Sequence, residues 1–231
     1  MSYMQDVPVR NRHLLRLLNQ YRDFLMNDLD GFQENFHLTC QEDASNRHWW
    51  VGDDYLREVI NQGTDHEGFP DSMHGYEVSV HRKGHEFFTR DAAPVFRKEK
   101  TAELSTMMKN LIDWLGVRHN ALTAFYPPGG YISWHNNANA SAYNLIFSWS
   151  ETGNGYFKYV DPETKEVVKM KDHSGWQCKA AYFGHYGEPE RLFYHAASTD
   201  CWRITVSFTF DTSDLSELFR EDLLEEIASE E

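Results

Sequence analysis

Apolar residues recur at helical spacing near both ends of the chain. The first stretch predicts an amphipathic helix that packs on an apolar surface through Leu14, Leu15, Leu18, Tyr21, Leu25 and Leu29. A second helix is expected from a cap at Thr101 to a left-handed stop at Gly116, with an apolar face of Leu104, Met107, Met108, Leu111 and Leu115. A short helix is expected over 53–62. The acidic C-terminal segment predicts a helix with apolar positions Leu215, Leu218, Phe219, Leu223 and Ile227.

Strand patterns dominate after Gly116. The β-rich runs lie at 122–126, 143–149, 156–160, 167–170, 177–183 and 203–210, after an earlier run at 76–81. Asp161-Pro162 predicts a hairpin between two of them. Short antiparallel strands with helices before and after favour a jelly-roll, cupin-like double sheet over a parallel α/β fold. We therefore expect a mainly β fold with flanking helices in a single domain over 1–231, with helical support over about 1–116 and the β core over about 117–211.

Composition narrows the function classes. The 231 residues are 41% hydrophobic, which suits one buried core, and 36 acidic against 22 basic residues give a net charge of −14. That charge disfavours a broad phosphate-binding surface, so a nucleic-acid partner is not expected. Three cysteines without paired spacing favour a reducing compartment, and no apolar run approaches the ~18 residues of a membrane span. A cytoplasmic protein is expected; its oligomeric state cannot be read from the sequence.

The final strand pattern carries a candidate acid-binding pair. Along 203–210, Ile204, Val206, Phe208 and Phe210 share one face, and Arg203, Thr205, Ser207 and Thr209 share the other. Such a polar face usually meets water. Arginine pairs bidentately with carboxylates, and a threonine two residues on can bond the same group. Arg203 and Thr205 therefore suggest a clamp for an acid.

Two histidines could meet across the predicted sheets. His135 precedes most of the strand runs and His195 precedes the last one, as ligands from two walls of one barrel would. Spacing alone favours a structural or surface role for each of them over a role as a ligand, because the chain has 12 histidines and chance pairings are easy. His173 and His185, with Asp172, form an alternative ligand set.

In this order the residues resemble the 2-oxoglutarate and iron(II)-dependent oxygenases, in particular the branch that contains prolyl hydroxylases and nucleic-acid demethylases. The resemblance covers roughly the C-terminal half of the chain. It is carried by Tyr126, Gly129, His135, the segment 148–157 with Gly153 and Gly155, His195-Ala and Arg203-Ile-Thr205.

The resemblance implies a double-stranded β-helix and a dioxygenase site. His135 and His195 would bind iron(II), and 2-oxoglutarate would chelate the metal through its keto acid end. Arg203, helped by Thr205 and Tyr126, would hold the distal carboxylate. The expected reaction is hydroxylation of an amino-acid side chain, in a peptide or a free small molecule, coupled to oxidation of 2-oxoglutarate to succinate and carbon dioxide.

Asn137 departs from the family's pattern. The family motif is usually His-any-Asp, whereas this chain has His135-Asn136-Asn137. An amide in place of a carboxylate removes one negative charge beside the metal, which lowers affinity for a hard divalent ion. The expected ligand set is His135, Asn137 and His195. Three outcomes are open. Asn137 is a poor ligand in a working oxygenase, or iron is bound by the two histidines and an anion, or the domain has lost catalysis.

Three alternatives stay open. A catalytically silent domain would keep the fold as a binding or structural module, and a zinc or other metal cupin would use Arg203 only as an ion-pair partner. A nucleic-acid demethylase would require a basic groove formed by Arg82, Lys83, Arg90, Arg97, Lys98 and Lys100.

Overall fold

Two antiparallel sheets form the body of the protein. The computed structural model describes residues 3–27, 46–62, 75–83, 86–88, 98–117, 120–137, 140–210 and 214–230. The seven-stranded sheet has the order β1 (Gln5–Val7), β10 (Gly175–Phe183), β7 (Ala142–Ser150), β12 (Arg203–Phe210), β5 (Asn120–Tyr126), β3 (Val78–Lys83) and β4 (Glu86–Phe88). The five-stranded sheet has the order β2 (Gly75–Tyr76), β6 (Tyr131–His135), β11 (His195–Thr199), β8 (Gly155–Val160) and β9 (Val167–Lys171).

The chain winds from one sheet to the other as it runs from β5 to β12. β5, β7, β10 and β12 belong to the larger sheet, and β6, β8, β9 and β11 belong to the smaller one. Eight strands wound in this way, with neighbours far apart in sequence, form a double-stranded β-helix, or jelly roll. The predicted fold class is confirmed, mainly β with flanking helices.

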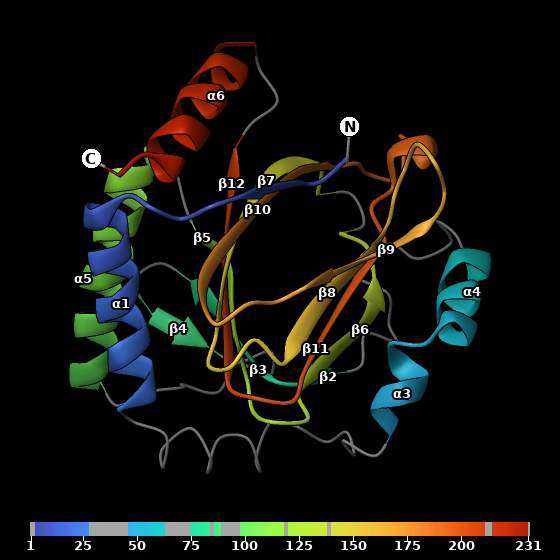
Figure 1. Cartoon of the computed structure of the whole chain (residues 1–231), viewed down its shortest axis with the longest axis horizontal. Coiled ribbons are helices and arrows are strands. Elements are labelled where there is room, and N and C mark those ends of the chain that lie inside the picture. The colour runs from blue at the N-terminus through green and yellow to red at the C-terminus, as the bar shows by residue number, and fades with distance from the viewer. Residues whose placement is uncertain are drawn as a thin grey trace.

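Helices lie outside the sheets. Figure 1 shows α1 (Arg12–Met26) and α5 (Lys98–Leu115) side by side on one flank, with α6 (Asp214–Ala228) above them, and α3 (Arg47–Trp50) and α4 (Asp53–Gln62) on the other. A 3₁₀ turn, η2, covers Pro189–Arg191. None of the described helices is long and apolar enough to cross a bilayer.

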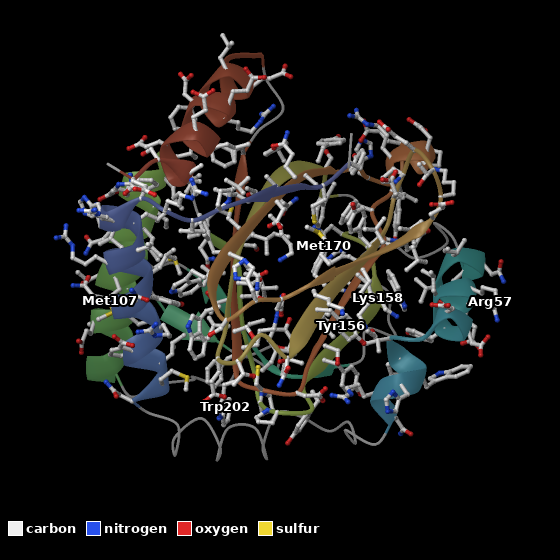
Figure 2. The ribbon with its side chains drawn as sticks, in the orientation of Figure 1. Arg57, Met107, Tyr156, Lys158, Met170 and Trp202 are labelled. Atoms are coloured by element: carbon white, nitrogen blue, oxygen red, sulfur yellow. The ribbon has the colours of Figure 1, made fainter. Side chains whose placement is uncertain are left out.

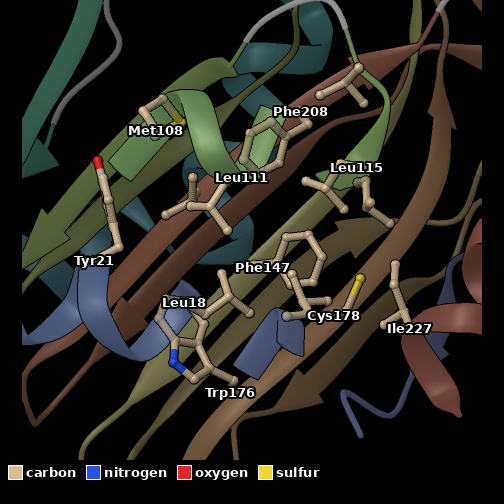
Figure 3. Close-up of a cluster of buried hydrophobic side chains, with 14 of the residues drawn as sticks. Leu18, Tyr21, Met108, Leu111, Leu115, Phe147, Trp176, Cys178, Phe208 and Ile227 are labelled. Atoms are coloured by element: carbon tan, nitrogen blue, oxygen red, sulfur yellow. The ribbon is translucent and has the colours of Figure 1, made fainter. Parts of the chain in front are cut away.

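The largest hydrophobic core lies between the helices and the outer face of the larger sheet. The predicted apolar faces of α1 and α5 meet the outward face of β12, where Ile204, Val206 and Phe208 have no exposed surface. Figure 3 shows Leu18 and Leu111 facing Phe147 and Cys178 in this core. The apolar face of β12 therefore packs against the helices, and its polar face lies between the two sheets.

A second cluster fills the space between the sheets, and a third covers the outer face of the smaller sheet. Phe157 and Tyr159 of β8 face inward. Lys158, between them, faces outward, donates to the Val51 carbonyl at 3.1 Å and lies over the ring of Tyr156. Figure 2 labels Tyr156 and Lys158 on β8 and Met170 on β9. α3 and α4 are thus held on the outside of the smaller sheet.

Several predicted details differ from the structure. α5 begins at Lys98, so Thr101 lies inside the helix and is not its cap. Gly116 has the expected left-handed backbone, with φ of 64°. On α6 only part of the expected apolar face is covered: Leu223 and Ile227 are buried, whereas Leu218 is 64% exposed. Leu29 and Cys40 lie outside the described residues.

The helix-sheet core predicts unequal costs for one substitution at two leucines. Leu111→Ala removes a side chain with no exposed surface, and we expect it to lower the free energy of unfolding by about 2–5 kcal/mol. Leu218→Ala, at a 64% exposed position, is the matched control and is expected to change it by less than about 0.5 kcal/mol. Urea unfolding measures both, and equal losses would contradict this account of the core.

Candidate functional site

His135 and His195 meet between the two sheets. β6 and β11 are antiparallel neighbours, and their register places His195 directly opposite His135. The ring centroids are 4.1 Å apart, with 51° between the ring planes. Both side chains are buried. The structure therefore brings together the two predicted histidine ligands.

Each histidine ring is oriented in the same way by its own strand. Nδ1 of His135 donates to the Ser133 carbonyl at 2.7 Å, and Nδ1 of His195 donates to the Phe193 carbonyl at 3.0 Å. A carbonyl only accepts, so Nδ1 carries a proton in both rings, and Nε2 is the nitrogen through which either ring would bind a metal. This is the tautomer of a metal-binding imidazole whose other nitrogen is held by the backbone.

Aromatic rings surround His195 and keep it neutral. Its centroid lies 5.0 Å from that of Phe183 and 5.7 Å from those of Phe157 and Phe193. Burial lowers the pKa of His195 to about 4, against a partial opposing effect of the Phe193 carbonyl. The imidazole therefore presents a lone pair throughout the neutral pH range.

A β-bulge in β6 sets which residues face inward. His195 pairs with His135, but Ala197 pairs with Ile132, so two residues of β6 stand opposite Ala196. Ile132 packs between the sheets, whereas Trp134 packs with α3 and α4 on the outside. Simple alternation would not place both Ile132 and His135 inside. The bulge reverses the pleat and aims His135 at its partner.

Asn137 and its neighbour lie just beyond β6. Asn137 is partly buried, and its carbonyl accepts from the Ala140 amide at 3.0 Å. Asn136 is buried and hydrogen-bonds with the hydroxyls of Tyr186 and Tyr194, whose pKa values are raised by burial and lowered in part by that bond. Within the described ranges, no His, Cys, Asp or Glu completes a group of three with the two histidines.

Arg203 lies on the inward face of β12, among polar groups. Its side chain is 1% exposed. Nε donates to Asp172 Oδ2 at 2.8 Å, and the terminal nitrogens donate to Thr205 Oγ1 and, at 3.1 Å, to Ser148 Oγ. The guanidinium carbon lies 5.4 Å from the Tyr126 ring centroid. Arg203, Thr205 and Tyr126 are thus contiguous.

Asp172 is a site residue that the sequence pattern did not identify in this role. It follows β9, and its carboxylate reaches inward past Gly155. A Cβ on Gly155 would stand 2.5 Å from Asp172 Oδ2 and 3.1 Å from Thr199 Oγ1. The glycine is therefore required for the approach of Asp172 to Arg203. Its place at the start of β8 was the one available signal.

The alternative ligand set is not assembled. Asp172 is engaged with Arg203, His173 is exposed, and Nε2 of His185 lies 3.6 Å from Glu188 Oε2. No group of three potential metal ligands contains them among the described residues. The alternative metal site formed by His173, His185 and Asp172 is therefore wrong, because the fold does not bring the three side chains together.

The histidine pair fits a divalent metal ion. Two imidazoles that bind one ion from adjacent positions at ~2.1 Å place their ring centroids about 4.5 Å apart, close to the observed separation. Nε2 is the nitrogen through which each ring would bind the ion, and aromatic rings pack beside His195. Imidazole ligands suit iron, zinc and copper alike, so the pair selects a class of metal and not one element.

Comparison with known proteins identifies no family: no family model and no curated protein match the chain. Among solved structures it is similar to a Pseudomonas putida prolyl-4-hydroxylase, at 12% identity and a TM-score of 0.29, over 48% of this chain and 64% of that one. It is also similar to E. coli ycfD, at 14% identity and a TM-score of 0.31, over 74% of this chain and 48% of that one. A rice dioxygenase for auxin oxidation matches at 13% identity and a TM-score of 0.32, over 76% of this chain and 68% of that one.

These three structures are oxygenases by description, and ycfD has also been solved with cobalt and 2-oxoglutarate. The chain spans about half the length of ycfD and 64% of the prolyl hydroxylase. The fold of this chain rests on its own strand order.

The low pKa of His195 predicts a pH-dependent stability of the metal-free protein. The unfolded chain binds a proton at His195 near pH 6.5, whereas the folded imidazole stays neutral down to about pH 4. Stability is therefore lost as the pH falls from about 6.5 to about 4, by about 3 kcal/mol from this group. Urea unfolding across that range should show a flatter profile for His195→Leu. His13→Leu, at an exposed position on α1, should keep the original slope.

Gly155 predicts a second effect on stability. Gly155→Ala forces Asp172 away from Arg203, and we expect the free energy of unfolding to fall by about 1–3 kcal/mol. Asn154→Ala changes the neighbouring exposed side chain and should cost less than about 0.5 kcal/mol. Thermal or urea unfolding compares the two, and a neutral Gly155→Ala would show that Asp172 tolerates displacement.

Proposed function

We propose that the chain is a non-haem iron(II) and 2-oxoglutarate-dependent oxygenase that hydroxylates an amino-acid side chain, in a peptide or a free small molecule. The observation that carries the proposal is the cross-strand pair of His135 and His195, with Nδ1 of both rings held by backbone carbonyls. A purely structural pair of neutral rings has no need of matched tautomers.

The metal and cosubstrate are assigned to particular residues. His135 and His195 are the imidazole ligands, and Asn137 offers a weak amide oxygen from the end of the same strand. Arg203, with Thr205 and Tyr126, is assigned to the distal carboxylate of 2-oxoglutarate. When bound, iron and 2-oxoglutarate together supply oxidation by dioxygen. The substrate class follows from the sequence resemblance along Tyr126 to His135.

The chain's own contribution is orientation and exclusion of water. The carbonyls of Ser133 and Phe193 hold both imidazoles in one orientation, with Nε2 as the nitrogen that would bind the metal. The rings of Phe157, Phe183 and Phe193 limit solvent around His195. At the far end of the interior, Asp172 and Ser148 fix the orientation of Arg203.

Two other functions have a specific observation in their favour. Asn137 in place of a carboxylate supports a catalytically silent binding module. The ion pair between Arg203 and Asp172 supports a metal cupin that uses no 2-oxoglutarate, since there Arg203 has only a structural partner. The basic residues from Arg82 to Lys100 on which a demethylase would depend have no described side chains.

An anaerobic titration with iron(II) and then 2-oxoglutarate tests the proposal. We expect a visible charge-transfer band in the native protein, followed by iron-dependent succinate production in air. His195→Ala removes a ligand and should weaken iron binding at least about tenfold, whereas His173→Ala, at an exposed position, should not. Asn137→Asp supplies a hard ligand and should tighten iron binding by about tenfold.

The outcomes separate the three functions. A band only in Asn137→Asp would favour the silent module, because the pocket would be intact and the amide would be the defect. Metal binding without any 2-oxoglutarate band in either protein would favour the cupin without cosubstrate. Succinate formation by the native protein would exclude the silent module.

A further inference from the structure

A buried cluster at the polar end of the barrel holds two cations and one carboxylate. Arg203, Lys179 and Asp172 have side chains that are 1%, 1% and 0% exposed. Arg203 Nε lies 2.8 Å from Asp172 Oδ2, but Lys179 Nζ lies 3.9 Å from Oδ1, beyond hydrogen-bond distance. With both bases protonated, the cluster carries one uncompensated positive charge. Isolated buried charge is costly, so the cluster favours an anion.

Hydrogen-bonding groups around Lys179 are left without partners. Lys179 donates to Gln177 Oε1 at 3.0 Å, and because an ammonium only donates, the Gln177 amide must present Nε2 on its other side. Within the described residues, Gln177 Nε2 and Asp172 Oδ1 are both buried with no hydrogen-bond partner. Orphaned buried atoms of this kind mark a place for a water, an ion or a ligand.

The donors of Arg203 point to the same conclusion. Its two terminal nitrogens each make one bond, to Thr205 Oγ1 and Ser148 Oγ, and each carries a second N–H. Gln177, Ser148 and Thr205 lie at one level of adjacent strands, since Gln177 pairs with Ser148 and Ser148 pairs with Thr205. Guanidinium, ammonium and amide donors thus belong to one patch of the inward face.

Lys179 also responds to the charges that face it. Burial lowers its pKa and Arg203 lowers it further, while Asp172 on the β9–β10 connection, Asp6 on β1 and Cys178 raise it. An additional anion in the cluster would raise this pKa again. A bound carboxylate therefore favours the protonated form of Lys179.

We propose that Lys179 is the second cation of a carboxylate pocket that it forms with Arg203 and Gln177, and that this pocket selects small dicarboxylates over monocarboxylates. The inference deepens the proposed function, because it concerns the pocket assigned to the distal carboxylate of the cosubstrate. Asp172 is the positioning residue, which orients Arg203 through Nε and leaves its terminal edge to the ligand. A monocarboxylate that uses its acid group elsewhere leaves the extra positive charge uncompensated.

Calorimetric titration of the metal-free protein with succinate tests this pocket without iron. Lys179→Met should weaken succinate binding at least about tenfold. Lys179→Arg keeps a positive charge at this position and should retain most of the affinity. Lys171→Met, at an exposed position, should behave as the native protein.

A second variant guards against a folding defect. Gln177→Leu removes the amide donor without changing the charge and should weaken succinate binding by about threefold to tenfold. Thermal unfolding confirms that each variant is folded before titration. Undetectable succinate binding by the native protein, or unchanged affinity in Lys179→Met, would overturn the inference.

The proposed function fails in a different way. If succinate binds through Lys179 but iron and 2-oxoglutarate give no charge-transfer band, the carboxylate pocket is supported and the oxygenase proposal is contradicted. If the band forms equally well in the native protein and Lys179→Met, with equal affinities for 2-oxoglutarate, the oxygenase proposal stands and Lys179 has no part in it.

Discussion

The burial of Arg203 between the two sheets is the constraint on which the interior of this protein depends. A guanidinium removed from water is tolerated only if its donors are matched, and removal of one member of a buried pair costs about 3–5 kcal/mol. Asp172, Ser148 and Thr205 supply those partners from three different strands or their ends. Gly155 is required because any larger residue would block the carboxylate.

This requirement divides the barrel interior into two chemically distinct ends. At one end lies the histidine pair, and Phe157, Phe183 and Phe193 surround His195, whose burial favours the neutral imidazole. At the other end Arg203 and Lys179 leave an excess of positive charge. A ligand with a metal-chelating group and a distant carboxylate matches both ends at once. Neither end alone distinguishes a metal cupin from an oxygenase, and the combination is what supports the proposed function.

Much of the fold and part of the site could be predicted from local pattern. The strand runs are found close to their predicted positions, because alternation along 203–210 reports directly which side chains face the helices. Helix limits were less accurate: α5 extends three residues before Thr101, since a threonine hydroxyl also fits inside a helix. The sequence does not identify Asp172 as the partner of Arg203, because the two are 31 residues apart. They meet only when the end of β9 folds against the start of β12.

The sequence by itself determined the period of each element, the alternation of apolar and polar residues along β12 and the residue types able to bind a metal or an acid. Those properties depend on residues only a few positions apart in the chain, so the local spacing of residues predicts them. Only the tertiary structure decided that His135 lies opposite His195, that a bulge turns His135 inward, and that Lys179 is buried beside Arg203 and Asp172. Register, bulges and buried charge arise from pairing between distant strands, and no local pattern of residues specifies which strands will become neighbours.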